Sequence, residues 1–228
     1  MSLQTATRTM LLLFLLLALA CGPSQAVAAS SADPLLKEAE ELVIGKDYVG
    51  AAAKLEVAIA QNPQQAAAYL QLCDVLEALG QNAEAQKTLQ QGIKAAAAQD
   101  PLQRQLSYRS GLLAALKLDD RKTAEAVAKA LPASAEKSDL QGVLALLDQQ
   151  TQPALERFVE ALPKATGHDA EARIHYHAAL AHHGADDLDN AMASLFNAIN
   201  KATNLALIKD IEQLWGKLYA LQLKSRAQ

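Results

Sequence analysis

The chain has 228 residues, a formal net charge of −4, and an apolar fraction of 51% with only 4% aromatic residues. This composition can supply a buried core, and its reliance on alanine and leucine favours tightly packed helices over sheets. A mildly acidic chain without a run of lysine or arginine lacks the electrostatic footprint of a nucleic-acid-binding protein, so we expect no nucleic-acid partner.

Residues 1–28 have the pattern of an export signal followed by a short linker. Arg8 precedes an unbroken apolar run over residues 10–20. That run is too short to span a bilayer, but it fits the core of a secretory signal peptide. We therefore expect an exported protein that lies in the periplasm.

Two processing sites remain open. Residues 18–21 (Ala-Leu-Ala-Cys) resemble a bacterial lipoprotein box, which would remove residues 1–20 and lipidate Cys21. Residues 26–28 (Ala-Val-Ala) form an A-x-A cleavage motif, which would release a soluble chain starting near Ala29. The first alternative anchors the protein to the outer membrane, and a lipid on Cys21 is the only membrane contact that we expect.

Residues 32–99 match themselves when the sequence is shifted by 34 positions. The overlay pairs residues of similar role, namely Leu35 with Tyr69, Ala39 with Cys73, Leu42 with Leu76, Ala51 with Ala85, Leu55 with Leu89 and Ala58 with Gly92. Two antiparallel helices approach closely only where a small side chain faces a large one. A period of 34 with small residues at fixed points therefore predicts two regular helical hairpins, with turns at residues 45–47 and 80–82.

This pattern resembles the tetratricopeptide repeat family. The residues that fit the family motif are Asp47, Tyr48, Ala51, Leu55, Ala58 and Pro63 in the first copy, and Tyr69, Leu72, Cys73, Gly80, Ala85, Leu89 and Gly92 in the second. The resemblance implies an all-α fold: a right-handed superhelix, or solenoid, of about five antiparallel helix pairs. It also implies a scaffold that binds a protein or peptide partner.

Residues 100–203 lose the strict period but keep its small residues. Ala85 is followed at the same motif position by Ala124, Ala154 and Ala191, at intervals of 39, 30 and 37. We therefore expect three degenerate helical repeats. The first of them, residues 102–131, matches the motif least well.

The fourth repeat matches the motif better in its second helix than in its first. Gly142, Ala154 and Phe158 fall on motif positions, whereas Ala145 stands where the regular copies have leucine. The sequence therefore defines the second helix of this repeat more clearly than the first.

Residues 204–228 contain a last helix with one broad apolar face, from about Leu205 to Leu223. Because the end of a stack of repeats needs a cover, we expect a C-terminal capping helix. The alternative is that Trp215 and Tyr219 form a contact with a partner or a second copy, as in a self-associating structural protein of the envelope.

Histidine is the one cluster that could bind a metal. The five histidines are His168, His175, His177, His182 and His183. A site on one helix needs donors three or four positions apart, and no two of them have that separation. His182 with Asp186 has the spacing, but Gly184 is expected to break the helix between them. We expect no metal and no cofactor, and a metal-binding protein remains the weaker alternative.

No catalytic motif is present in the sequence. It contains neither a G-x-S-x-G nucleophile motif nor a glycine-rich phosphate loop. Cys73 occupies a small position of a repeat helix, where a thiol behaves as a buried apolar group. We therefore expect that the protein is not an enzyme.

The concave groove of the solenoid is the predicted binding site. By resemblance to the family, fixed positions of the first helices line it, here Leu36, Glu40, Val43, Leu70, Asp74 and Glu77. Carboxylates over an apolar floor should favour a partner with lysine or arginine among its apolar residues. The sequence thus predicts an exported scaffold or assembly factor that holds a basic, apolar polypeptide in the cell envelope.

Overall fold

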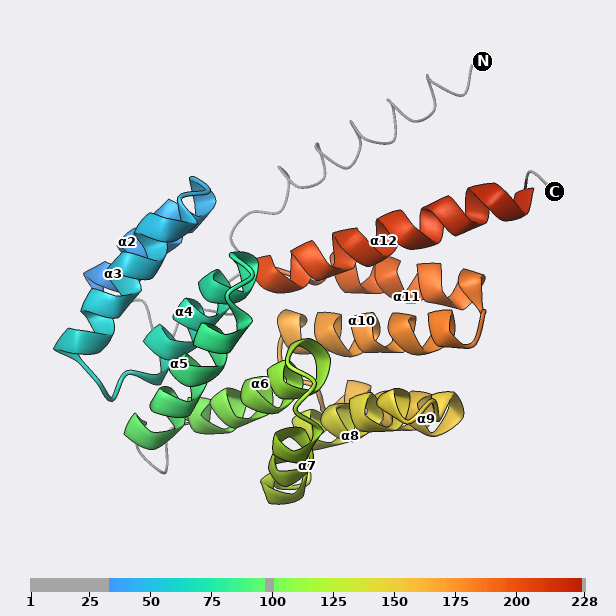
Figure 1. The fold of residues 1–228 in the computed structure, drawn as a ribbon, viewed down its shortest axis with the longest axis horizontal. Coiled ribbons are helices and arrows are strands. Elements are labelled where there is room, and N and C mark those ends of the chain that lie inside the picture. Colours follow the sequence, from blue (N-terminus) through green and yellow to red (C-terminus); the bar gives the residue numbers. More distant parts are fainter. Residues whose placement is uncertain (1–32, 97–100, 227–228) are drawn as a thin grey trace, which may run out of the picture. The chain divides into compact units, whose positions relative to one another are not determined.

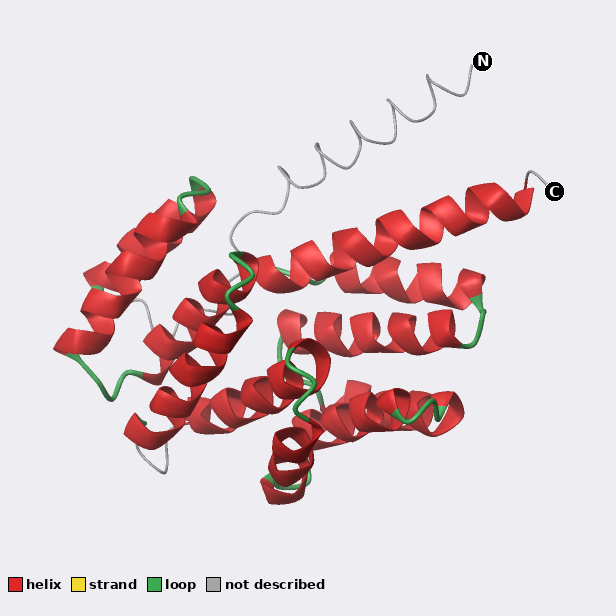
Figure 2. Cartoon of the chain, in the orientation of Figure 1, coloured by secondary structure: helices red, strands yellow, loops and turns green. Residues whose placement is uncertain are grey.

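A computed structural model describes residues 33–96 and 101–226, and every regular element in these residues is helical (Figure 2). The helices are α2 (Pro34–Ile44), α3 (Tyr48–Gln61), α4 (Ala66–Ala78), α5 (Asn82–Ala95), α6 (Pro101–Lys117), α7 (Arg121–Ala130), α8 (Ala135–Leu147), α9 (Thr151–Ala161), α10 (His168–Gly184), α11 (Leu188–Ile199) and α12 (Leu205–Arg226). The first ten form five antiparallel pairs, and α12 follows them (Figure 1). The fold is the predicted all-α superhelix of helix pairs.

The turn inside each pair has one residue with left-handed backbone. These residues are Lys46, Gly80, Asp119, Gln149 and Asp186, with φ between 53° and 77°. Their spacings are 34, 39, 30 and 37 residues, the same as the spacings of the motif alanines. The later pairs therefore keep the turn at the same motif position, and the intervals differ mainly because the helices differ in length, from 10 residues in α7 to 17 in α6 and α10.

The second helix begins two residues after the left-handed residue, with its N-cap residue between them. In three pairs the first residue after the turn is an aspartate whose carboxylate accepts a hydrogen bond from a backbone N–H of the first helical turn. Asp47 binds Gly50 N at 2.9 Å, Asp120 binds Thr123 N at 3.1 Å and Asp187 binds Asn190 N at 3.2 Å. Such N-caps satisfy donors that have no partner within the helix, so turn and cap together fix each hairpin.

Small residues mark the closest approach of the two helices in each pair. The motif alanines Ala51, Ala85, Ala124, Ala154 and Ala191 are all 0% exposed. A Cβ on Gly142 would lie 2.4 Å from the ring of Phe158, so only glycine lets α8 approach α9 this closely. The first helix of the fourth pair, which the sequence defines less clearly, thus packs by the same small-against-large rule.

The helix α12 covers the last pair and also reaches back to the second. Leu207, Ile211, Leu214 and Leu218 are at most 5% exposed and form a core with α10 and α11. The beginning of α12 also lies beside α4 (Figure 1). The predicted capping helix is therefore present, and it makes a contact with the second pair that the sequence does not predict.

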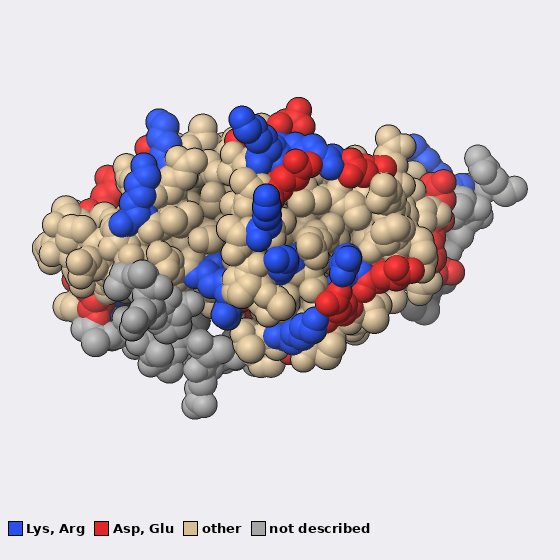
Figure 3. Space-filling view, turned by 90° about the horizontal axis from the view of Figure 1, so that it is seen from below, with Lys and Arg blue, Asp and Glu red and all other residues tan. Residues whose placement is uncertain are grey.

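One face of the described chain is mixed in charge (Figure 3). On the face seen in Figure 3, basic and acidic side chains are interspersed and do not form a field of one sign. Among the described helices, none combines the length and the apolarity that a bilayer span requires.

Candidate functional site

A cluster of ionised side chains joins α4 to α6. Arg109 of α6 is 8% exposed, and its guanidinium lies 2.6 Å from Asp74 Oδ1 and 2.5 Å from Glu77 Oε1. The thiol of Cys73 donates to the same oxygen of Glu77 at 3.1 Å. One cation is thus held between two carboxylates, away from solvent.

The surroundings of this cluster fix its charge state. Burial acts to raise the pKa of Glu77, but the charges of Arg109 and Arg173 and the Cys73 hydrogen bond outweigh it, and the pKa is lowered. Burial raises the pKa of the Cys73 thiol well above its ordinary value. Burial disfavours charged Arg109, but Asp74 and Glu77 raise its pKa. The carboxylate and guanidinium are therefore charged and the thiol is neutral at pH 7.

A second buried network joins α6, α8 and α10. Tyr108 donates its hydroxyl to Asp139 Oδ2 at 2.5 Å, and Nδ1 of His177 lies 2.9 and 2.8 Å from the two oxygens of Asp139. Asp139 is 0% and His177 1% exposed, and burial followed by the charge of Asp139 raises the pKa of Tyr108 well above its ordinary value. The trio is buried between α6, α8 and α10, and His177 also lines the small cavity beside Arg173.

Helix α6 is the joint between these networks. Its consecutive residues Tyr108, Arg109 and Ser110 are all buried, and each binds a different neighbouring helix. Ser110 accepts a hydrogen bond from Gln86 of α5 at 2.9 Å. Polar groups that are buried and paired in this way fix the orientation of neighbouring pairs, since any shift would leave one of them unpaired.

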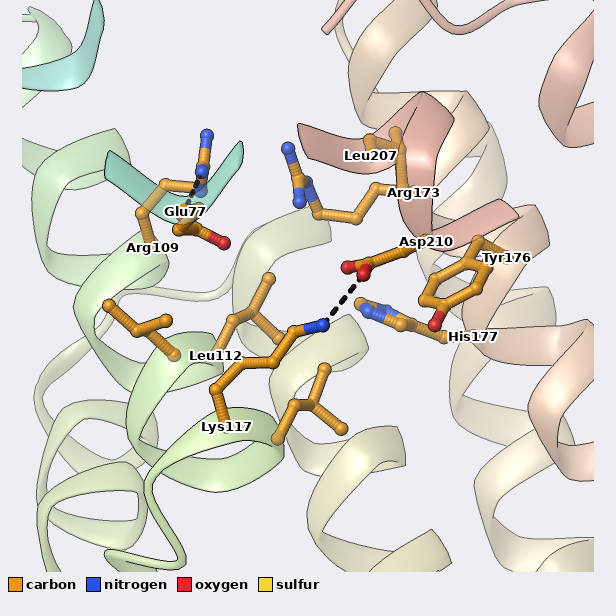
Figure 4. Close-up of a pocket in the computed structure, with 11 residues that line it drawn as sticks. Glu77, Arg109, Leu112, Lys117, Arg173, Tyr176, His177, Leu207 and Asp210 are labelled. Carbon is orange, nitrogen blue, oxygen red and sulfur yellow. Dashed lines mark hydrogen bonds and ion pairs between the residues drawn. The ribbon is translucent and has the colours of Figure 1, made fainter. Parts of the chain in front are cut away.

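The helix α12 closes the space between α4, α6 and α10 (Figure 4). Lys117 of α6 pairs with Asp210 at 2.7 Å, and Lys209 donates to the carbonyl of Ala78 at 2.7 Å. One cavity, beside Arg173, has a volume of about 20 Å³. That is room for about one water molecule. A second cavity of about 150 Å³ lies beside it, between α4, α6 and α12, and is lined by Glu77, Lys117, Lys209 and Asp210.

Most of the charges around these cavities are paired. The acidic groups Asp74, Glu77 and Asp210 face the basic groups Arg109, Lys117 and Arg173. Arg173 makes no ion pair among the described residues, but its charge acts on Glu77. Arg109 and Lys117 are thus paired with carboxylates, whereas Arg173 and Lys209 add positive charge beside the cavities.

Four of the six predicted groove residues are buried or already paired within the chain. Leu36 is 1% exposed, so it belongs to the core and does not line an open groove. Glu40 accepts a hydrogen bond from Gln71 at 2.9 Å. Asp74 and Glu77 bind Arg109 and are not free to read the lysine or arginine of a partner. The sequence does not predict this pairing, because Arg109 lies on α6, in the repeat that matches the family motif least well.

The other two predicted groove residues remain accessible in part. Val43 and Leu70 are partly buried and pack at the edge of the first core cluster. Cys21, the predicted lipidation site, lies outside the described residues.

The histidines are not brought together. His177 is buried against Asp139, and His182 lies 3.4 Å from Asp187 beyond the end of α10. Among the described residues, the one group of three potential metal ligands is Cys73, Asp74 and Glu77. Because the guanidinium of Arg109 already contacts both of these carboxylates, this group serves an internal ion pair.

Residues 42–107 match the family model of the tetratricopeptide repeat. No curated protein sequence matches the chain significantly. Among solved structures, the fold is similar to PilW, a widely conserved type IV pilus biogenesis factor, with a TM-score of 0.54 and 18% identity over 85% of this chain and 91% of that one. It is also similar to a thermophilic tetratricopeptide protein of Thermus thermophilus, with a TM-score of 0.52 and 18% identity over 78% of this chain and 96% of that one.

A third similar structure is a chain of the APC/C hetero-tetramer Cut9–Hcn1, with a TM-score of 0.58 and 13% identity over 82% of this chain. The match covers 36% of that chain, so the present chain spans little more than a third of its length. At these identities the likeness concerns the fold alone. The sequence match supports tetratricopeptide repeats over residues 42–107, and the described helices on both sides of that segment continue the same repeat fold.

Proposed function

We propose that the protein is an exported, non-catalytic scaffold or assembly factor that holds a partner polypeptide in the cell envelope. The observation that carries this proposal is the fold, five tetratricopeptide-type helix pairs braced by α12. Proteins with such repeats bind protein or peptide partners. The buried polar groups support a binding role over catalysis, because they pair with one another and a neutral, buried Cys73 is a poor nucleophile.

The accessible part of the first two pairs is where we place one contact with the partner. Val43 and Leu70 offer apolar surface beside Glu40. With Asp74 and Glu77 neutralised by Arg109, this contact relies on shape and apolar area more than on charge. The partner that we propose is still a polypeptide with apolar residues. Its lysine or arginine residues would pair with an acidic group other than Asp74 and Glu77.

Export and anchoring rest on the N-terminal sequence. An apolar run over residues 10–20 followed by Cys21 or the Ala-Val-Ala motif supports either a lipid-anchored or a soluble periplasmic form. Intact mass spectrometry of the protein from its own envelope fraction tests this. We expect a chain that begins at acylated Cys21 or near Ala29, and a full-length chain found only in the cytoplasm would refute export.

A further inference from the structure

The first helix of each pair can be divided into three faces by what each one contacts. One packs on the preceding pair, one faces the surface shared by the first helices, and one packs on the second helix of its own pair. In α4 this last face carries Tyr69, Cys73 and Leu76, which are all at most 5% exposed. In α12 the first face packs on α10 and α11 and consists of Leu207, Ile211, Leu214 and Leu218. The second face lines a cavity beside α4 and α6 and consists of Ala206, Lys209, Asp210 and Gln213.

The third face of α12 carries Ile208, Glu212, Trp215, Tyr219 and Leu223. With 3.6 residues per turn these five positions fall within an arc of about 80°. Ile208, Trp215 and Tyr219 are only partly buried, and Leu223 is 48% exposed. Trp215 also packs against the core that α12 forms with α10 and α11. The stripe therefore has the spacing and the large apolar residues of a helix-pairing face, and the described helices cover it only in part.

One charge interrupts this stripe. Glu212 is exposed and has no ion-pair partner among the described residues. Along the helix it lies between Ile208 and Trp215, and around the arc it lies between Tyr219 and Leu223. A carboxylate in this position stays solvated while the stripe is open, but it requires a cation once a second helix excludes the water.

We propose that a partner protein supplies a helix that packs antiparallel on α12, in the position of the second helix of a sixth pair. The chemistry of α12 specifies that helix. It carries apolar residues three or four positions apart, a small residue opposite the Trp215 ring, and a lysine or arginine that meets Glu212. This inference deepens the proposed function by placing the basic, apolar partner on α12.

A second copy of α12 fits this face less well. An antiparallel pairing that sets Ile208 against Leu223 of the other copy brings the two Trp215 rings together, with two large rings where a small residue should face a large one. It also sets Glu212 opposite Tyr219, so neither carboxylate meets a cation. The stripe is therefore not complementary to itself.

Trp215 is the only tryptophan in the chain, so its fluorescence reports directly on this face. The probes are two synthetic amphipathic helical peptides of about five turns, alike except that one carries lysine and the other glutamate at the position facing Glu212. We expect the lysine peptide to shift the emission of the full chain to shorter wavelength. We also expect it to bind about fivefold more tightly than the glutamate peptide, as one exposed ion pair allows.

Two variants make the test specific. Glu212→Lys should reverse the preference between the peptides. Glu56→Lys, which changes an exposed glutamate on α3 by the same amount, should leave it unchanged. Circular dichroism of both variants establishes that the fold is retained.

Three results would overturn the inference. The first is that neither peptide alters the emission of the folded chain. The second is a blue shift that grows with protein concentration alone, with twice the mass in light scattering, because a second copy would then cover the face. The third is a shift produced by vesicles of anionic lipid and by neither peptide. All three are independent of whether the protein is exported, so they leave that part of the proposed function standing.

Discussion

The pairing of Arg109 with Asp74 and Glu77 changes what these two carboxylates can bind. From the sequence, Asp74 and Glu77 are surface acids that could attract a basic partner. In the structure they hold a guanidinium that is 8% exposed. A buried cation with two carboxylates stabilises the fold only while all three are present, because each charge has lost its water.

Replacement of Arg109 by leucine should therefore be severe. It leaves two partly or largely buried carboxylates without their cation, and we expect the free energy of unfolding to fall by about 3–5 kcal/mol. Urea unfolding followed by circular dichroism measures this. Arg157→Leu is the matched control, since its pair with Glu160 is exposed and its loss should lower the free energy by at most about 1 kcal/mol. Equal losses for the two variants would contradict this description of the cluster.

The lowered pKa of Glu77 makes stability depend on acid pH. The carboxylate has a lower pKa in the folded chain than its ordinary value of 4.5, so its contribution is present above that value. It is lost as the pH falls through the lower, folded value, where Glu77 takes up a proton. We expect Glu77→Gln to be less stable than the parent at pH 7 and to lose less stability between pH 7 and acid pH. Parallel pH profiles of the two proteins in urea unfolding would show that Glu77 is not coupled to folding.

At the scale of the helix pair, the positions of the turns could be predicted from the sequence, but the contacts that α6 makes with its neighbouring helices could not. The intervals of 39, 30 and 37 between motif alanines reappear between the left-handed turn residues, so spacing alone locates all five hairpins. The interval of 39 contains α6, and it leaves unknown which face of α6 turns toward α4. Arg109 could not be assigned to Asp74 for that reason, and the Tyr108, Asp139 and His177 trio was missed for the same reason.

The turns also predict which substitutions relieve strain. Gln149 has φ of 59°, a conformation in which a Cβ costs about 1 kcal/mol, so Gln149→Gly should stabilise the protein by up to about that amount. Gly80→Ala is the converse change and should destabilise by a similar amount. A Cβ on Gly80 would meet nothing within 4 Å, so this change tests the backbone alone. Thermal unfolding checks both signs, and a gain from Gly80→Ala would contradict the assignment.

The contact between α12 and the earlier pairs depends on the curvature of the stack, which no local pattern encodes. The ion pair between Lys117 and Asp210 joins residues 93 positions apart, and both side chains are partly exposed. We expect a double-mutant cycle of Lys117→Ala and Asp210→Ala to give a coupling of about 0.5–1 kcal/mol. A coupling near zero would mean that α12 is held there by its apolar residues alone.

For the whole molecule, the polar groups inside the described chain serve the fold, and the surface serves recognition. Most ionised groups of α4, α6 and α12 pair with one another, and the cavities between these helices have volumes of about 20 and 150 Å³. Partly open apolar surface remains around Val43 and Leu70 and along the third face of α12. This division is what a scaffold that holds another polypeptide requires.

The most direct test of that claim is cross-linking in the producing cell. A photo-reactive amino acid at Val43 should give a discrete adduct with another polypeptide in the envelope fraction. The same amino acid at Val159, which is 71% exposed on α9, should give none. An adduct from Val43 alone would establish that this surface holds a partner. The absence of any adduct from Val43, or equal adducts from both positions, would contradict a scaffold that binds through its first two helix pairs.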